Sequence, residues 1–339
     1  MKRVLILTIS ILCIWTASAF FTGNRAEAAP KYLIKFATVA PEGSTWIKRM
    51  RDVDKELREK SGDQLGLRIY AGGIAGDEID VLKKIRIGQI QCAAFSGVGF
   101  GQILPMVRVL DLPFLFRSDE ETDRVHNELQ QFFAEEFKKK GFELLAWGEV
   151  GNVHIFSKDP VRKVEDFAGL KVWAWSGDPI AKETFAAMGV NPIPLAITDV
   201  TTGLSTGMID TVYAPPIGAL ALQWHTNLRY MTALPFVHST GAVLISLKYY
   251  EKLPKGLEEL LKSTLVKAMA EMTTEVRNQS VEAVEIIKKS GLEIIPIPEG
   301  EALKEFYGIN GKVARSLTGE IYPRELLERV YLILGRPCP

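Results

Sequence analysis

The chain has 339 residues, with 41 basic and 41 acidic side chains, a formal net charge of zero at pH 7 and three cysteines. Because the charges balance and no basic patch or charge run is visible, the composition argues against a nucleic-acid-binding protein. The cysteines and histidines show no spacing typical of a metal site, and we expect neither a metal nor a cofactor.

The first 28 residues have the pattern of a secretory signal peptide. A lysine and an arginine precede an apolar run from Val4 to about Phe21, and residues 26–28 (Ala-Glu-Ala) fit a small-residue cleavage site. We expect cleavage after residue 28 and export to the periplasm, with a retained membrane anchor as the alternative. About 310 residues remain, enough for two domains. Cys92 and Cys338 also remain, and we expect two separate thiols, although an oxidising compartment permits a disulfide.

The first part of the exported chain alternates apolar strands with amphipathic helices. Strands are predicted at 31–40, 65–70 and 90–96, and helices at about 41–63 and 78–87. In the first helix, apolar residues recur at helical spacing until a Ser-Gly pair ends it. This alternation indicates a parallel sheet that helices cover on both faces.

The same alternation returns after residue 169. Asp178 is predicted to cap a helix that starts at Pro179, and a strand is predicted at 242–247. Apolar residues at helical spacing then predict one helix over about 255–290. Its length of about 50 Å exceeds the width of a small domain, so we expect it to run along both domains.

Two glycine-containing motifs have functional counterparts elsewhere. "GLSTG" (203–207) matches the nucleophile elbow of a serine hydrolase, but an elbow needs a strand before the serine. The residues before it predict a helix start, so we expect Ser205 near a helix end with Gly207 as terminator, and a secreted hydrolase is a minor alternative. "GVGFG" (97–101) lacks the third glycine of a dinucleotide fingerprint, because Gln102 stands there, and we expect a flexible turn at the rim of a cleft.

The segment "GLKVWAW" (169–175) predicts a strand with Trp173 and Trp175 two residues apart. Residues i and i+2 of a strand point to the same face, so two indoles share one side. That face is either buried core or the floor of a binding site, and the local pattern leaves both open.

Six segments occur in an order that is similar to a known receptor family. They are "IKFATVAPEGSTW", "YAGGIAGDE", "LDLPFLF", "VEDFAGLKV", "AMGVNPIPLAITDVTTGLSTGMIDT" and the long late helix. The chain resembles the solute receptors of tripartite ATP-independent periplasmic (TRAP) transporters of the DctP type. The resemblance covers nearly the whole chain after residue 28.

The resemblance implies an α/β, two-domain periplasmic-binding-protein fold with a ligand cleft, crossing strands and one long domain-spanning helix. It places residues 30–150 and 240–279 in domain I, and residues 151–239 and 280–339 in domain II. It also implies a monomeric or homodimeric receptor that closes on a small-molecule solute and delivers it to integral-membrane TRAP permease subunits. A sensor that presents its ligand to a membrane kinase is the alternative function.

The resemblance also locates a site whose charged groups are replaced. The family arginine that pairs with the substrate carboxylate falls on Trp173, and a second arginine position falls on Val153. The usual polar residues after "MID" are replaced by Tyr213 and Ala214. We therefore expect a site that has kept its position and lost its carboxylate clamp.

An aromatic cleft follows from these replacements, with indole N–H groups available to orient a polar group of the solute. The predicted ligand-binding residues are Trp173, Trp175, Tyr213, Trp147, His154, Asn152, Ser96, Phe95 and Glu149. Three solutes remain open: an apolar or aromatic carboxylate on Asn152, His154 or Ser96, a neutral hydrophobic solute, or a cation opposite Glu149. A C4-dicarboxylate receptor with a non-standard clamp is a further alternative.

Overall fold

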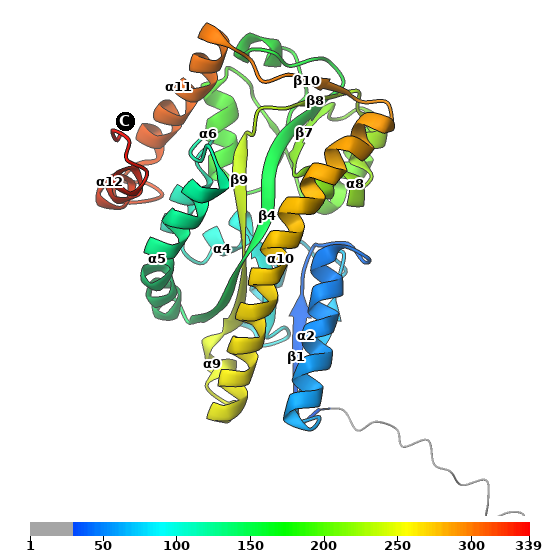
Figure 1. Ribbon diagram of the computed structural model, residues 1–339, viewed down its shortest axis with the longest axis vertical. Helices are drawn as coiled ribbons and strands as arrows, with labels where there is room; N and C mark the ends of the chain where they lie inside the picture. The colour runs from blue at the N-terminus through cyan, green and yellow to red at the C-terminus, as the bar shows by residue number, and fades with distance from the viewer. Residues whose placement is uncertain (1–29) are drawn as a thin grey trace, which may run out of the picture.

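The structure is a computed structural model that describes residues 30–339 (Figure 1). The predicted signal peptide, residues 1–28, lies outside the described residues. The strands are β1 (Tyr32–Ala37), β2 (Leu65–Tyr70), β3 (Cys92–Ser96), β4 (Phe142–Ser157), β5 (Trp173–Trp175), β6 (Ile193–Leu195), β7 (Thr211–Ala214), β8 (Tyr230–Thr232), β9 (Val237–Ser246) and β10 (Glu293–Ile295). The α-helices are α2 (Thr45–Ser61), α3 (Glu78–Arg86), α4 (Gly97–Gly101), α5 (Asp119–Lys139), α6 (Pro179–Ala187), α7 (Val200–Thr206), α8 (Pro216–Ala221), α9 (Leu247–Tyr250), α10 (Lys255–Lys289), α11 (Gly300–Leu317) and α12 (Arg324–Ile333). Short 3₁₀ helices are η1 (Pro105–Asp111), η2 (Val164–Phe167), η3 (Ile197–Asp199) and η4 (Trp224–Asn227).

The main sheet is mixed and has the order β2-β1-β3-β9-β4-β8-β10, with β7 pairing with β4 beside this path. Strand β1 is parallel to β2 and β3, whereas β9 is antiparallel to both β3 and β4. The prediction of a parallel sheet is therefore wrong for the pairs that β9 and β4 form, whereas β8 and β10 are again parallel. The reason is that β9 returns from the second half of the chain, which local strand–helix alternation does not reveal.

Strands β4 and β9 are the expected crossing strands, and they lie side by side through the middle of the molecule (Figure 1). The first part of β4 pairs with β9, and its last four residues, from His154 to Ser157, pair with β7. The register shifts between Glu149 and Gly151. Gly151 has a φ of 111°, a backbone conformation that residues with a side chain rarely adopt. Strand β4 continues to pair with β9 up to Val153, beyond this bulge, and pairs with β7 from His154 onward.

Helix α10 confirms the predicted long helix, because it runs over Lys255–Lys289, 35 residues. It crosses the molecule diagonally and packs against β4, α2 and α8 (Figure 1). Its buried face carries Leu265, Met269 and Met272. Together with the crossing strands, it joins the two halves of a two-domain α/β fold, as predicted. Within residues 30–339, no helix is long and apolar enough to cross a membrane.

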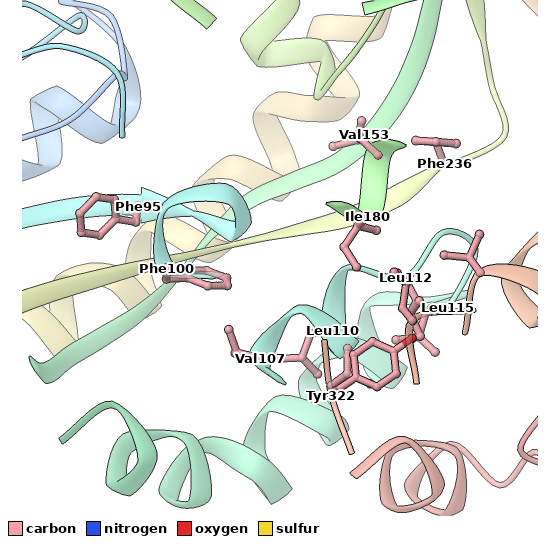
Figure 2. Packing of buried hydrophobic residues seen from close by; sticks show 14 of the residues in the cluster. Phe95, Phe100, Val107, Leu110, Leu112, Leu115, Val153, Ile180, Phe236 and Tyr322 are labelled. Atoms are coloured by element: carbon pink, nitrogen blue, oxygen red, sulfur yellow. The ribbon is translucent and has the colours of Figure 1, made fainter. Parts of the chain in front are cut away.

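Several local predictions are confirmed as well. Asp178 caps α6, where its carboxylate accepts hydrogen bonds from the Ile180 and Ala181 N–H groups. Cys92 and Cys338 are both free thiols. The buried hydrophobic residues around the end of β3 and the crossing strands appear in Figure 2, where Val153 and Phe236 lie beside each other above Ile180.

Candidate functional site

A cavity of about 220 Å³ lies where β3, β5, β7 and the crossing strands meet. Its aromatic lining consists of Trp46, Phe95, Trp173, Trp175, Tyr213, Trp224 and Phe236. Val153 also lines it, so both positions at which the resemblance predicts a replaced arginine lie in this lining with apolar side chains. The cavity therefore has the mostly apolar lining with a few polar groups that is typical of a small-molecule site.

Trp173 and Trp175 lie on the cavity wall, yet both are nearly buried, with exposed fractions of 1% and 8%. Their ring centroids are 6.1 Å apart, and Trp173 stacks on Tyr213 at 4.8 Å. Trp224 packs edge-on against Trp173 at 5.4 Å. The shared face of the two indoles is thus both core and cavity wall, so the two interpretations of "GLKVWAW" are not exclusive.

The indole N–H groups of this wall are already bonded to protein acceptors. Trp173 Nε1 donates to the Leu195 carbonyl at 3.0 Å, and Trp175 Nε1 donates to the Asp77 carboxylate at 2.9 Å. The same holds for Trp224, on Thr201, and for Trp46, on the Glu149 carbonyl. In this conformation each of these N–H groups therefore has a protein acceptor, which the sequence did not predict.

Glu78 and the "GVGFG" motif form one polar end of the cavity. The Glu78 carboxylate accepts hydrogen bonds from the Ser96 N–H and hydroxyl and from the Gly99 N–H, at 2.7 to 3.0 Å. Burial raises the pKa of Glu78 from 4.5 to about 7, although these hydrogen bonds oppose the shift.

The motif itself is a short helix, α4, and not the flexible turn that was predicted. A Cβ at Gly99 would lie 2.6 Å from Glu78 Oε2, and a Cβ at Gly97 would lie 2.2 Å from Asp111 Oδ2. The glycines are needed because two buried carboxylates approach the helix backbone, a requirement that depends on the tertiary contacts.

Arg108, Asp111 and Asp178 form a second polar end that sequence reasoning missed. Arg108 Nη2 lies 2.8 Å from Asp178 Oδ1, and its Nε lies 2.8 Å from Asp111 Oδ2. Burial alone would lower the pKa of Arg108, but the two aspartates raise it. Burial raises the pKa of Asp111 to about 7, even beside Arg108. The available signal was an isolated charged pair, three residues apart, inside the apolar run "MVRVLDLPFLF".

The nine predicted ligand residues divide into two groups. Trp173, Trp175, Tyr213, Phe95 and Ser96 line the cavity together. The other four, Trp147, His154, Asn152 and Glu149, lie outside its lining in the described structure.

Each member of the second group has other partners. Trp147 packs edge-on against the rings of α4 and α5, including Phe100, at 6.0 Å. His154 Nδ1 contacts the Thr232 carbonyl at 3.0 Å, and Asn152 Oδ1 lies 3.1 Å from a ring nitrogen of His238. The Glu149 carboxylate accepts from Arg277 at 2.8 to 2.9 Å. These side chains support the crossing strands behind the cavity.

The "GLSTG" serine lies on α7, as predicted, and not on an elbow between a strand and a helix. The turn η3 precedes this helix, and Gly207 ends it with a φ of 70°. Ser205 is exposed and donates its hydroxyl to the Thr201 carbonyl at 2.8 Å. Its hydroxyl therefore caps its own helix turn, away from the cavity lining.

Comparison with known proteins connects this fold and cavity to a family. The model of the bacterial extracellular solute-binding proteins, family 7 (DctP), matches residues 36–316. A solute-binding protein of Chromohalobacter salexigens is 31% identical over 165 residues, which are 48% of this chain and 49% of that protein. The C4-dicarboxylate-binding periplasmic protein of Rhodobacter capsulatus is 24% identical over 244 residues, 70% of this chain and 72% of that protein.

Among solved structures, a TRAP periplasmic solute-binding protein of Pseudomonas putida F1 with bound D-glucuronate is 25% identical. It superimposes with a TM-score of 0.82 over 91% of this chain and 98% of that chain. The family match spans most of the described residues, and the fold agrees with it. The chain therefore belongs to family 7 of the bacterial extracellular solute-binding proteins, as a DctP-type receptor of the TRAP transporters.

Proposed function

We propose that this receptor captures a small organic solute with an apolar or aromatic body and delivers it to a TRAP-type secondary permease. The observation that supports this proposal is the replacement of both family arginine positions by Trp173 and Val153, which face one aromatic cavity. Burying a flat apolar body against such a wall supplies most of the binding free energy. The solute is then an apolar carboxylate or a neutral hydrophobic molecule.

We propose Trp173, Trp175, Tyr213, Phe95 and Ser96 as the side chains that contact the solute, since they share the cavity lining. The proposed domain division, 30–150 with 240–279 and 151–239 with 280–339, puts these residues on both sides of the cleft. A solute that touches both sides favours the closed state and shifts the population toward it. We assign no catalytic group to this cavity, and we propose a mature periplasmic protein cut after residue 28.

Two alternatives remain, of which the first has a specific observation in its favour. The relative from Rhodobacter capsulatus is named for C4-dicarboxylates, which suggests a dicarboxylate receptor in which Arg108 acts as a non-standard clamp. A ligand-presenting sensor would use the same cavity but a different membrane partner. Neighbouring genes separate transport from sensing, because permease genes support transport and a sensor kinase gene supports signalling.

The test is thermal unfolding of the exported protein, residues 29–339, with a panel of solutes. A ligand at about one hundred times its Kd adds roughly 2.7 kcal/mol to the free energy of unfolding. We expect stabilisation by aromatic or alicyclic compounds and none by succinate or malate. Stabilisation by the C4-dicarboxylates alone would overturn the proposal and support the clamp on Arg108.

A further inference from the structure

The ion group Arg108–Asp111–Asp178 lies at one end of the solute cavity and is almost completely buried. The exposed fractions of its three residues are 5%, 5% and 8%. Arg108 and Asp111 come from η1, whereas Asp178 precedes α6, 70 residues further along the chain than Arg108. In the proposed domain division the Arg108–Asp178 pair joins domain I to domain II across the cleft.

Two further polar contacts join the same two walls. Trp175 Nε1 donates to Asp77 Oδ2 at 2.9 Å, and Gln102 Nε2 donates to the Gly177 carbonyl at 3.2 Å. A second cavity, of about 570 Å³, shares Arg108, Trp175 and Asp178 with the solute cavity as lining. These three residues therefore separate the solute cavity from the second cavity.

The charges around the solute cavity disfavour an incoming anion. Among residues 30–339, Arg108 is the one basic side chain in the lining, against the three carboxyl groups of Glu78, Asp111 and Asp178. Arg108 already faces two of them at 2.8 Å. A solute carboxylate would add a third negative group beside Arg108 in a site of low dielectric, where like charges repel strongly.

Burial raises the pKa of Asp111 to about 7, and the nearby Asp178 charge acts in the same direction, against the attraction of Arg108. The N–H donors of the lining indoles are bonded to protein acceptors and are therefore not available to an anion in this conformation.

We propose that Asp178 takes the place of a solute carboxylate: its ion pair with Arg108 holds the two walls together, and the cavity accepts an uncharged solute with an apolar body. This inference rests on the proposed function and narrows it. In a receptor with a carboxylate clamp, an arginine binds the carboxylate of the solute. Here Arg108 binds a carboxylate of the receptor itself, that of Asp178. Asp178 then determines the specificity for uncharged solutes, because its carboxylate pairs with Arg108, the one basic side chain of the lining among residues 30–339.

The experiment compares solutes that share a ring and differ in charge. Isothermal titration at pH 7.5 gives the Kd of benzoate, benzamide and benzylammonium, and of cyclohexanecarboxylate with its carboxamide. The variant Asp178→Asn removes the charge and keeps a good helix cap, since asparagine caps as well as aspartate. If it folds poorly, Asp178→Ser also retains a capping oxygen. The matched control is Asp166→Asn, at a half-buried aspartate outside the cavity lining that accepts hydrogen bonds from the Arg162 and Lys163 N–H groups.

In the wild type we expect each carboxamide to bind at least about tenfold more tightly than its acid. In Asp178→Asn the ratio of the acid Kd to the amide Kd should fall at least about tenfold, because Arg108 becomes available to the acid. Asp166→Asn should keep the wild-type ratio. This combination would support the proposal.

Three other results would overturn it in distinguishable ways. If the wild type binds the acids or benzylammonium most tightly, the uncharged solute is wrong, while an apolar receptor survives. If the carboxamides bind the wild type more tightly than the acids but Asp178→Asn leaves the ratio of the acid Kd to the amide Kd unchanged, Asp178 does not determine specificity. If no ring compound binds the wild type, the proposed function fails, and this inference fails with it.

Discussion

Two aromatic clusters in this receptor have similar composition and different surroundings. In the first, Trp173 stacks on Tyr213 and faces the cavity. In the second, the partly buried Trp147 packs against Phe100, Phe133 and Phe137 at 6.0 to 6.3 Å, with His126 at 5.4 Å. The family comparison placed both tryptophans in the cleft. The difference teaches that an aromatic group becomes a candidate site only where the tertiary packing also places it on the wall of a cavity.

The indole N–H groups of the two clusters also differ in their hydrogen bonding. Trp173 Nε1 has the Leu195 carbonyl as its acceptor, whereas the buried Nε1 of Trp147 has no hydrogen-bond partner among the described residues. An unpartnered buried donor costs free energy. The Trp147 cluster therefore contributes to stability mainly through ring packing, and the Trp173 cluster combines packing with a shaped wall.

Replacement of Trp173 by alanine should have the largest combined effect. Because the side chain is only 1% exposed, the free energy of unfolding should fall by about 3–5 kcal/mol. Solute affinity should also weaken by more than about 1 kcal/mol, since a packed ring contact is lost. Urea unfolding and calorimetric titration measure the two quantities. Unchanged affinity in the folded variant would make Trp173 core alone.

The corresponding change Trp147→Ala should reproduce the stability loss without the binding loss. We expect a decrease of about 3–5 kcal/mol in the free energy of unfolding, because the ring fills space between α4, α5 and β4. Affinity should remain within about twofold when titrated below the unfolding range. A tenfold weaker solute Kd would instead place Trp147 in the binding site and remove the distinction between the clusters.

The two regions should respond to pH with opposite sign. Burial raises the pKa of Glu78, beside the cavity, to about 7, so the folded state holds its proton more tightly than the unfolded chain. Stability from this group is present below about pH 4.5 and is lost as the pH rises through 7. Burial lowers the pKa of His126, which contacts Trp147, to about 4. Its contribution is present above about pH 6.5 and is lost as the pH falls toward 4.

In the wild type, Glu78 should lower the free energy of unfolding by about 3 kcal/mol as the pH rises from 4.5 to 7. In Glu78→Gln this decrease should be absent. His126→Gln should remove the opposite, acid-side decrease. Denaturant unfolding at pH 5, 6 and 7 gives both differences relative to the wild type. If Glu78→Gln has the wild-type slope, Glu78 is ionised at pH 5, and its hydrogen bonds from Ser96 and Gly99 offset the cost of burial.

The smallest effect is expected at Ser205, which belongs to neither cluster. Because its exposed hydroxyl bonds only to the Thr201 carbonyl, Ser205→Ala should change the free energy of unfolding by less than about 0.5 kcal/mol. Solute affinity should be unchanged, which makes this variant a baseline for the tryptophan pair. An ester-hydrolysing activity that disappears in Ser205→Ala would contradict the receptor function.

Much of the fold was predictable from local patterns. The N-cap Asp178, the terminator Gly207 and the apolar spacing of α10 each depend on residues within one or a few helical turns. The place of β9 between β3 and β4 was not predictable in this way, since it pairs residues about 100 and 150 positions apart in a sheet whose order no local pattern encodes. The conformation of "GVGFG" failed for a related reason: its glycines respond to Glu78 and Asp111, which reach it only in the folded chain.

The amino-acid sequence by itself determined the elements and the family, and it is the basis of the proposal that Trp173 and Val153 stand in place of family arginines. The elements are predictable because helix caps, helix terminators and hydrophobic periodicity are local features of the sequence. The family is predictable because its six segments still occur in their usual order. Only the tertiary structure decided that Trp173 and Trp175 have satisfied N–H groups, that Trp147 faces away from the cavity, and that Arg108 pairs with Asp178. Each of these features depends on contacts between residues that are far apart in the sequence, which no local pattern predicts.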